Sequence, residues 1–156
     1  MYSPKIRTWS DNWNDVIRII FKDRIMRELM LIPDDCTITQ FIDKYFIEAS
    51  ATDEILTDEK VRILWFDGQG SATRNQGVRI KTKEFEIFVH KDYLHKATND
   101  RLQNRCRLIE QRLKEILLSS THICQLRFHF ESGYNLWTKS TGYVRYHSVF
   151  SYKVTT

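Results

Sequence analysis

Side chains in the last third of the chain alternate between apolar and polar at every second residue, and this alternation constrains the fold most strongly. Between residues 124 and 131 the apolar side chains are Cys124, Leu126, Phe128 and Phe130, and the polar ones are Gln125, Arg127, His129 and Glu131. Successive side chains of a β-strand point to opposite faces, so this segment is predicted to be a strand with one buried and one solvated face. Turns are expected near residues 132–133 and 140–142.

The closing segment, residues 142–154, is predicted to be a second long strand. One of its sides carries Val144, Tyr146, Phe150, Tyr152 and Val154, and the other carries Tyr143, Arg145, His147, Val149 and Lys153. Because the outward side is partly apolar, we expect this strand to need a cover from another element or another chain.

Three earlier segments are also typical of strands. Residues 60–66 are rich in branched and aromatic side chains, and residues 77–82 and 84–90 each alternate, the latter placing Phe85, Ile87 and Val89 on one face. The glycine-containing residues 67–76 are predicted to form a flexible loop after the first of these strands. Two or three antiparallel strands are expected in this region.

Helical periodicity is found in three segments. A first amphipathic helix is expected over about residues 14–32. Thr37 and Gln40 have the spacing of a capping box, which predicts a shorter second helix. The longest predicted helix covers residues 100–118, with a cap at residue 98 or 99 and one apolar stripe made of Leu102, Cys106, Ile109, Leu113 and Leu117.

Together these elements predict an α+β fold, with a small, largely antiparallel sheet backed by one long helix and with an N-terminal helical pair. The 156 residues are expected to form one domain, mainly helical over residues 1–58 and with a sheet–helix–hairpin core over residues 59–156. No apolar run is long enough to span a membrane, and the first residues lack the apolar stretch of a signal peptide. We therefore expect the protein to stay in the compartment where it is made, without membrane contact.

The cysteines, histidines and serines show no catalytic or metal-binding signature. Cys36, Cys106 and Cys124 lack C-x-x-C spacing and are expected to be core residues in a reducing compartment. His90 and His95 are close in sequence, but the histidines have no metal-site spacing and no serine lies in a G-x-S-x-G motif. We expect neither enzymatic activity nor a bound metal or cofactor.

Charge is distributed unevenly along the chain. Residues 1–73 hold 9 Lys/Arg against 13 Asp/Glu, a balance of −4, whereas residues 74–114 hold 11 against 5, a balance of +6. The densest basic run consists of Arg74, Arg79, Lys81 and Lys83. Two interpretations stay open, namely a nucleic-acid-binding module that uses the basic residues 74–114, or two complementary faces of a subunit that associates with itself.

Two further features favour contact with a partner. Trp9 and Trp13 are candidate anchors because tryptophan supplies a large contact area at interfaces, whereas Trp65 belongs to a predicted core strand. The loop at residues 67–76 lacks the G-K-[ST] ending of a phosphate-binding loop. It is instead predicted to be a hairpin arm that becomes ordered against a neighbouring subunit.

Four segments together resemble the neck proteins of tailed bacteriophages, particularly the tail-terminator and head–tail joining group. They are V-R-I-L-W (Val61–Trp65), F-E-I-F-V (Phe85–Val89), R-L-x-x-R-x-R-L-I-E (Arg101–Glu110) and G-Y-V-R-Y-H-S-V-F-S-Y-K (Gly142–Lys153). The likeness is one of element order over residues 60–156, since the family has no diagnostic short motif.

This resemblance implies a structural virion protein, made in the host cytoplasm, that forms a ring of six or possibly twelve identical subunits at the head–tail junction. Portal or adaptor proteins and tail-tube proteins would be its partners, and DNA would pass through the lumen. The residues expected at subunit or partner interfaces are Trp9, Trp13, Gln69, Arg74, Tyr143, Arg145 and His147. Those expected to line a DNA channel or a charged interface are Arg74, Arg79, Lys81 and Lys83.

Overall fold

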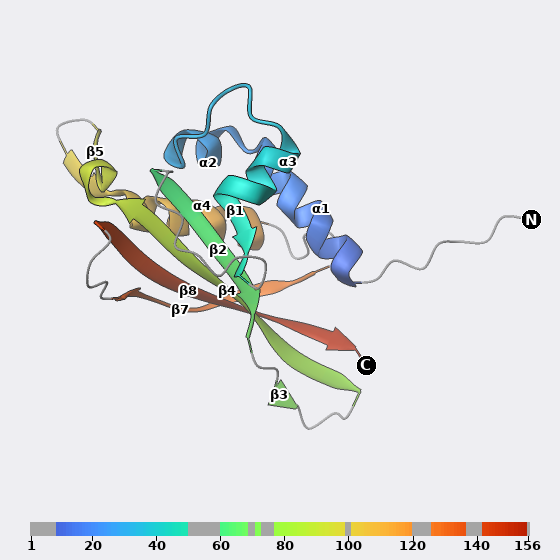
Figure 1. The fold of residues 1–156 in the computed structure, drawn as a ribbon. Coiled ribbons are helices and arrows are strands. Elements are labelled where there is room, and N and C mark those ends of the chain that lie inside the picture. The colour runs from blue at the N-terminus through green and yellow to red at the C-terminus, as the bar shows by residue number, and fades with distance from the viewer. Residues whose placement is uncertain are drawn as a thin grey trace, which may run out of the picture.

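The computed structural model describes residues 9–49, 60–68, 71–72, 77–98, 101–119, 126–136 and 142–155 (Figure 1). Its α-helices are α1 (Trp9–Lys22), α2 (Arg24–Leu29), α3 (Ile38–Gln40) and α4 (Arg105–Leu118), with a π-helical turn at Phe41–Tyr45 and a 3-10 turn at Lys91–Tyr93. Its strands are β1 (Phe46–Glu48), β2 (Val61–Asp67), β3 (Ser71–Ala72), β4 (Val78–His90), β5 (His95–Thr98), β6 (Arg101–Asn104), β7 (Phe128–Leu136) and β8 (Tyr143–Thr155).

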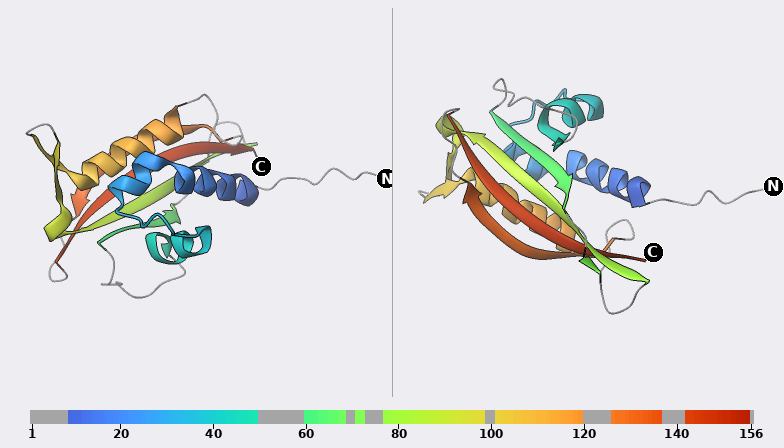
Figure 2. Two further views of the ribbon diagram at one scale, coloured as in Figure 1. Left: turned by 90° about the horizontal axis from the view of Figure 1, so that it is seen from above. Right: turned by 60° about the horizontal axis from the view of Figure 1, so that its bottom comes forward.

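The main sheet has the strand order β1-β2-β4-β8-β7, and β3 pairs with the beginning of β4. β1 and β2 are parallel, whereas all other neighbouring strands of this sheet are antiparallel. The helices α1, α2 and α4 lie on one face, and no described helix lies on the other (Figure 2). The predicted α+β class with a largely antiparallel sheet is confirmed, but α1 backs the sheet together with α4.

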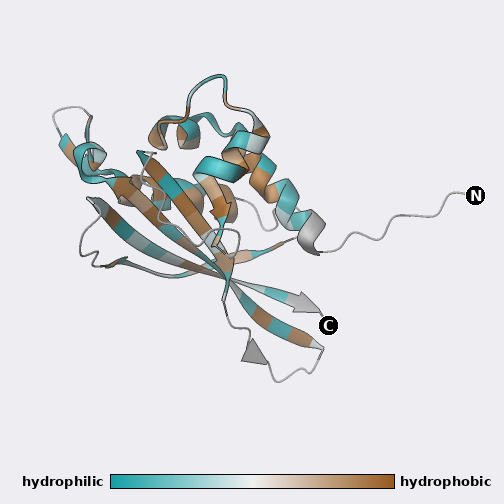
Figure 3. Ribbon diagram, viewed as in Figure 1, coloured by the Kyte–Doolittle hydropathy of each residue, from teal (hydrophilic) through white to brown (hydrophobic). Residues whose placement is uncertain are grey.

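The core lies between the helices and the covered face of the sheet. Phe85, Ile87 and Val89 of β4 are fully buried there, as their alternation predicted. Trp13 of α1 packs against them, with its ring centre 6.1 Å from that of Phe85 and 6.4 Å from that of Phe46. Apolar residues are correspondingly concentrated in α1, β1, β2 and the central part of β4 (Figure 3).

The helix predicted over residues 14–32 is interrupted at Asp23. The Asp23 carboxylate accepts a hydrogen bond from the Met26 amide at 2.8 Å and caps α2. It also accepts two hydrogen bonds from the Arg112 guanidinium of α4, at 2.9 and 2.5 Å. The helix is therefore interrupted at the residue that forms an ion pair with the distant helix α4. Nothing in the neighbouring sequence indicates that ion pair.

The second predicted helix begins as expected. Thr37 Oγ1 accepts a hydrogen bond from the Gln40 amide at 3.2 Å, and Gln40 Oε1 accepts one from the Thr37 amide at 3.0 Å. This reciprocal pair confirms the capping box. The helix then widens into the π-helical turn, which buries Phe41 and Tyr45.

The long helix α4 starts five residues later than predicted. Asn104 Oδ1 accepts hydrogen bonds from the amides of Cys106 and Arg107, at 2.9 and 3.4 Å, and so acts as its N-cap. Residues 101–104 form strand β6, which pairs with β5. Leu102, assigned to the apolar stripe by its spacing, is consequently 71% exposed.

The segments at 77–82 and 84–90, read as separate strands, form the single strand β4. Apolar residues occupy even positions in its first half, at Val78 and Ile80, and odd positions in its second half, at Phe85 and Ile87. Because the apolar positions shift from even to odd along the strand, the sequence pattern predicted two strands where the structure has one. The halves have different surroundings, because only the second is covered by helices (Figure 1).

β8 lies inside the sheet, so of the two covers expected for it, another element or another chain, other strands of the same chain supply one. β4 pairs with it over its full length, from Val78↔Thr155 to His90↔Tyr143, and β7 pairs with its other side. The turn predicted at residues 132–133 is also wrong. These residues continue β7 after a bulge between Phe130 and Ser132.

Candidate interaction surfaces

An arm made from β3, the beginning of β4 and the end of β8 bends away from the helices (Figure 1). We define the arm as residues 71–72, 77–82 and 151–155. Arg79 and Lys153 are exposed on it, and Val78 and Ile80 are half-buried. The base of the arm belongs to the core, since Tyr152 is fully buried and pairs with Phe128 of β7. The outer part consists of β3, β4 and β8, and no described helix covers it (Figure 1). This outer part is therefore suited to packing against a second surface.

Two of the four predicted basic residues, Arg79 and Lys81, lie on this arm. Arg74, and with it Gln69, lies outside the described residues. Within the segment predicted to be a loop, residues 67–76, Ser71 and Ala72 form β3 and pair with Ile80 and Arg79. That this segment becomes ordered against a neighbouring subunit stays a prediction.

Lys83, predicted for the same basic surface, lies in the core instead. Its side chain is fully buried, with Nζ 2.7 Å from Asp67 Oδ1 and 4.2 and 4.6 Å from the ring centres of Trp13 and Trp65. It points inward because position 83 shares the odd-numbered face of β4 with Phe85. Lys83 is thus enclosed within its own chain and offers no charge to DNA or to a neighbouring subunit.

Two effects act in opposite directions on the pKa of Lys83 in this buried cluster. Burial lowers the pKa of the Lys83 ammonium, while the hydrogen bond that this ammonium donates to Asp67 raises it. The pKa of the neighbouring Tyr152 hydroxyl is raised by burial and, secondarily, by the charge of Asp67. The ion pair lies among aromatic rings, and cation–π interactions with the faces of Trp13 and Trp65 also stabilise the Lys83 ammonium.

The predicted tryptophan anchors are not both available. Trp13 is 2% exposed and forms part of the core, which corrects its assignment to an interface. It faces inward because α1 packs its apolar stripe against the sheet. Trp9 is the first residue of α1, and its side chain lies outside the described residues.

Tyr143, Arg145 and His147 share the face of β8 that points away from the helices. Arg145 Nη2 donates a hydrogen bond to Glu86 Oε2 at 2.7 Å, and His147 Nε2 lies 2.9 Å from Glu84 Oε1. The structure thus brings these three predicted residues together, but two of them already have acidic partners on β4.

Aromatic rings enclose His147 on this open face. Tyr134 of β7 stacks on the imidazole with ring centres 5.2 Å apart, and Phe66 of β2 lies 5.9 Å away. His147 is consequently only 6% exposed, and Tyr143, whose ring centre lies 5.3 Å from that of His90, is 5% exposed. The face has few free charges and presents a mixed polar and aromatic surface.

The remaining cations of the basic stretch mostly hold helices in place. Arg105 is buried and donates hydrogen bonds to the carbonyl oxygens of Tyr93 and Leu29, both at 2.8 Å. Arg112 binds Asp23, Lys96 lies 3.4 Å from a carboxylate oxygen of Glu28, and Lys114 lies 3.5 Å from one of Glu110. Over the described residues the stretch therefore does not form one continuous basic surface.

Three exposed carboxylates, Asp34, Asp35 and Asp43, lie in and around the segment that carries α3, and none of them has an ion-pair partner among the described residues. They do not form a purely acidic surface, because Asp34 lines a pocket together with the cations Lys22, Arg24 and Arg27. Glu48 lies apart from them at the end of β1, paired with Trp65 of β2.

A buried carboxylate that the sequence did not reveal lies beneath α4. Glu110 accepts hydrogen bonds from the hydroxyls of Tyr146 at 3.3 Å and Ser148 at 2.5 Å. Gly133 leaves room for it, since a Cβ at that position would collide with Glu110 Oε2. Gly133 was the available signal, but its residue type was interpreted as a turn, whereas it lies within β7. With both hydroxyls directed at a carboxylate under a helix, the cluster joins α4 to the sheet.

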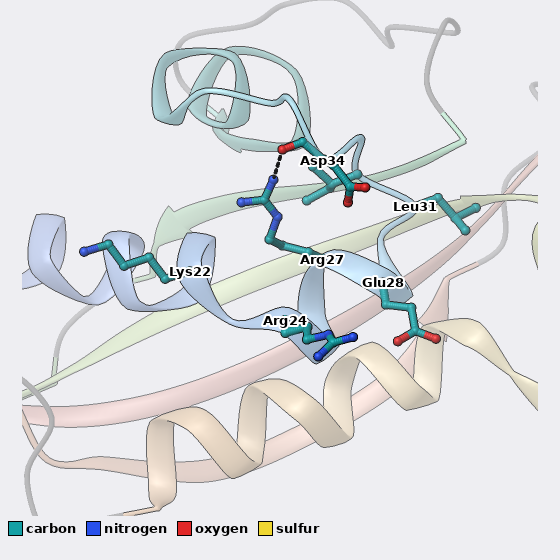
Figure 4. A pocket seen from close by; sticks show the side chains of 7 residues that line it. Lys22, Arg24, Arg27, Glu28, Leu31 and Asp34 are labelled. Carbon is teal, nitrogen blue, oxygen red and sulfur yellow. Dashed lines mark hydrogen bonds between the residues drawn. The ribbon is translucent and has the colours of Figure 1, made fainter.

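A pocket of about 400 Å³ lies where α1 gives way to α2 (Figure 4). It is lined by Lys22, Arg24, Arg27, Glu28, Leu31, Ile32 and Asp34. Arg27 donates hydrogen bonds to the carbonyl oxygens of Pro33 and Asp34, at 3.2 and 3.4 Å, and lies over the Phe21 ring. The Arg27 guanidinium is therefore engaged by the backbone of the turn at Pro33 and Asp34. The residues that line the pocket do not include an acid and a base paired with each other.

Cys36 and Cys106 are buried, and burial raises the pKa of the Cys106 thiol to about 12. Among the described residues, no group of three histidine, cysteine or carboxylate side chains could hold a metal ion. None of the helices in the described part of the chain has the length and apolar character needed to cross a membrane.

No protein-family model matches the sequence, and no curated protein matches it closely enough to identify a relative.

Proposed function

We propose that the protein is a structural virion subunit that forms a ring at the head–tail junction of a tailed phage, as a tail terminator or a head–tail connector component. The arm is the observation that carries this proposal. It places apolar and basic side chains beyond the subunit's own helical cover, where packing requires a second surface. The likeness in element order to neck proteins supplies the biological setting.

The dispersal of the basic stretch supports assembly over the alternative of a nucleic-acid-binding module. A dedicated binding surface needs several free cations on one face to neutralise phosphates. Here Lys83 and Arg105 are buried, and Arg112 is paired with Asp23. The function proposed therefore depends on contacts between subunits, with portal, adaptor or tail-tube proteins as neighbours.

The oligomeric state of the purified full chain tests this proposal. Light scattering after size exclusion, followed by negative-stain electron microscopy, should show closed rings, six subunits being the expected number and twelve an acceptable one. A protein that remains monomeric at high concentration, alone and beside neck or tail proteins, would contradict the proposal. Steep, salt-dependent DNA binding by the monomer would instead favour the nucleic-acid-binding module.

A further inference from the structure

We infer that the pocket at the junction of α1 and α2 binds one phosphate group carried on a small apolar molecule. The pocket has a volume of about 400 Å³ and is lined by Lys22, Arg24, Arg27, Glu28, Leu31, Ile32 and Asp34 (Figure 4). Sites for small molecules typically have volumes of about 300–1,000 Å³. This inference goes beyond the proposed ring and does not depend on it.

The interruption of the helix at Asp23 brings the cations of the pocket together. Side chains two residues apart on an unbroken helix do not face each other. Because α1 ends at Lys22 and α2 begins at Arg24, with Asp23 as the cap between them, both of these cations line the same pocket. Arg27 joins them because it lies three residues after Arg24 on α2. The basic side of the pocket is therefore a consequence of the helix break, at which Asp23 binds Arg112.

The charges of Lys22 and Arg24 are not used within the described part of the subunit. Both side chains are exposed, and neither forms an ion pair or a side-chain hydrogen bond with another described residue. Glu28, four residues after Arg24, lies instead 3.4 Å from Lys96. Cations that line one cavity without such partners repel one another and create a positive potential that favours an anion.

Arg27 is fixed in position but keeps hydrogen-bond donors. Its guanidinium lies over the Phe21 ring, 4.8 Å from the ring centre, and donates to the carbonyl oxygens of Pro33 and Asp34 from Nη2 alone. Its Nε and Nη1 make no hydrogen bond to another described residue. A guanidinium held in this way can donate charge-assisted hydrogen bonds to an anion with little further loss of side-chain entropy.

The rest of the lining defines the class of ligand. Leu31 and Ile32 provide apolar surface in the same pocket as the cations. Glu28 and Asp34 add two carboxylates, which disfavour a polyanion such as a nucleic-acid strand. A single phosphate group suits three cations, because it carries about two negative charges and three acceptor oxygens. The apolar part of the ligand would then contact Leu31 and Ile32.

Calorimetric titration of the full chain with three probes tests this ligand class. Phenyl phosphate should bind measurably, inorganic phosphate should bind about 10-fold more weakly because the apolar contact is missing, and phenol should not bind. Equal binding of phenyl phosphate and inorganic phosphate would show an adventitious ion only. Binding of phenol as tight as that of phenyl phosphate would contradict the need for an anion, and no binding of phenyl phosphate would overturn the site.

A double variant locates the probe. Lys22→Gln with Arg24→Gln removes two exposed cations that have no internal ion pair, and phenyl phosphate should then bind about 10-fold more weakly or worse. The control, Lys91→Gln with Arg101→Gln, makes the same change in net charge at exposed positions outside the pocket lining and should bind like the wild type. Circular dichroism establishes that each variant is folded, and Arg24→Gln alone carries the test if the double variant is not. Unchanged binding by the pocket variant, or equal weakening by the control, would overturn the inference and leave the ring proposal standing.

Discussion

The buried ion pair between Lys83 and Asp67 gives the sharpest prediction about stability. Asp67→Ala removes the carboxylate 2.7 Å from an ammonium that is fully buried. Removing one partner of a buried pair costs about 3–5 kcal/mol, and because the Asp67 side chain is 45% exposed, water compensates part of this loss. We expect the free energy of unfolding at pH 7 to fall by about 2 kcal/mol.

The matched variant is Lys83→Met, which removes the charge and keeps most of the volume. Its free energy of unfolding should stay within about 1 kcal/mol of wild type, because the desolvation cost disappears with the ion pair and the thioether packs well on Trp13 and Trp65. The double variant Asp67→Ala/Lys83→Met should recover most of the stability that Asp67→Ala loses. Urea unfolding followed by tryptophan fluorescence measures all four proteins.

The pH dependence separates this explanation from a simple packing defect. Burial holds the pKa of Lys83 in the folded protein below that of an unfolded lysine, about 10.4. Between these two pKa values the unfolded chain binds more protons, so stability rises with pH there, and the full cost is felt below both values. Asp67→Ala should therefore gain stability from pH 7 towards pH 9.5. If the double variant shows the same gain and the same loss at pH 7, Lys83 is not the source.

Three further predictions follow from local contacts. Gly133→Ala should destabilise the protein by about 1–3 kcal/mol in urea unfolding, because the new Cβ meets the Glu110 carboxylate, and by less when Glu110→Ala is also present. The hydrogen bonds from Arg112 hold the pKa of Asp23 below its ordinary value, so their stabilisation is present above about pH 3.9 and is lost as pH falls through the folded pKa. Asp23→Asn, which can still cap α2, should make the free energy of unfolding depend less on pH in this acid range. An unchanged dependence on pH would refute the pairing. Cys106, whose pKa burial raises to about 12, should resist alkylation at pH 8 until urea unfolds the chain, as peptide mass spectrometry can show.

Local side-chain pattern was sufficient to predict strand faces and one helix start. The alternation through Phe85, Ile87 and Val89 placed these residues correctly in the core, and Thr37 with Gln40 marked a helix start that the structure contains. Both signals act over a few residues, so no distant partner is needed to interpret them.

The errors arose where a distant partner decides the local structure. Nothing near Asp23 indicates that Arg112, 89 residues later, binds it and breaks the helix. Lys83 was assigned to a surface because lysine is seldom fully buried, and its burial depends on Asp67 and Trp13 meeting it in space. Asn104 caps α4, although residues 98 and 99 are also of residue types that commonly cap helices.

The predicted interface residues illustrate the same limit at the level of a site. Arg145 and His147 were placed on one face correctly, because period two fixes the side of a strand. Their binding to Glu86 and Glu84 depends on the register between β4 and β8, which the sequence alone does not specify. Residues that seemed free for a partner are therefore partly satisfied within the subunit, whereas the exposed Arg79 and Lys153 of the arm make no ion pair with another described residue.

The junction between core and arm connects stability with assembly. Lys83 lies in β4 directly after the arm residues 77–82, and its partner Asp67 ends β2, so this ion pair fastens the last covered part of β4 to its neighbour. Because β4 and β8 run without interruption from the core into the arm, the arm has a direction before any second subunit binds. A contact surface ordered in advance loses less conformational entropy on association. In the proposed ring, a subunit built in this way would present the exposed Arg79 and Lys153 to its neighbour at a fixed angle.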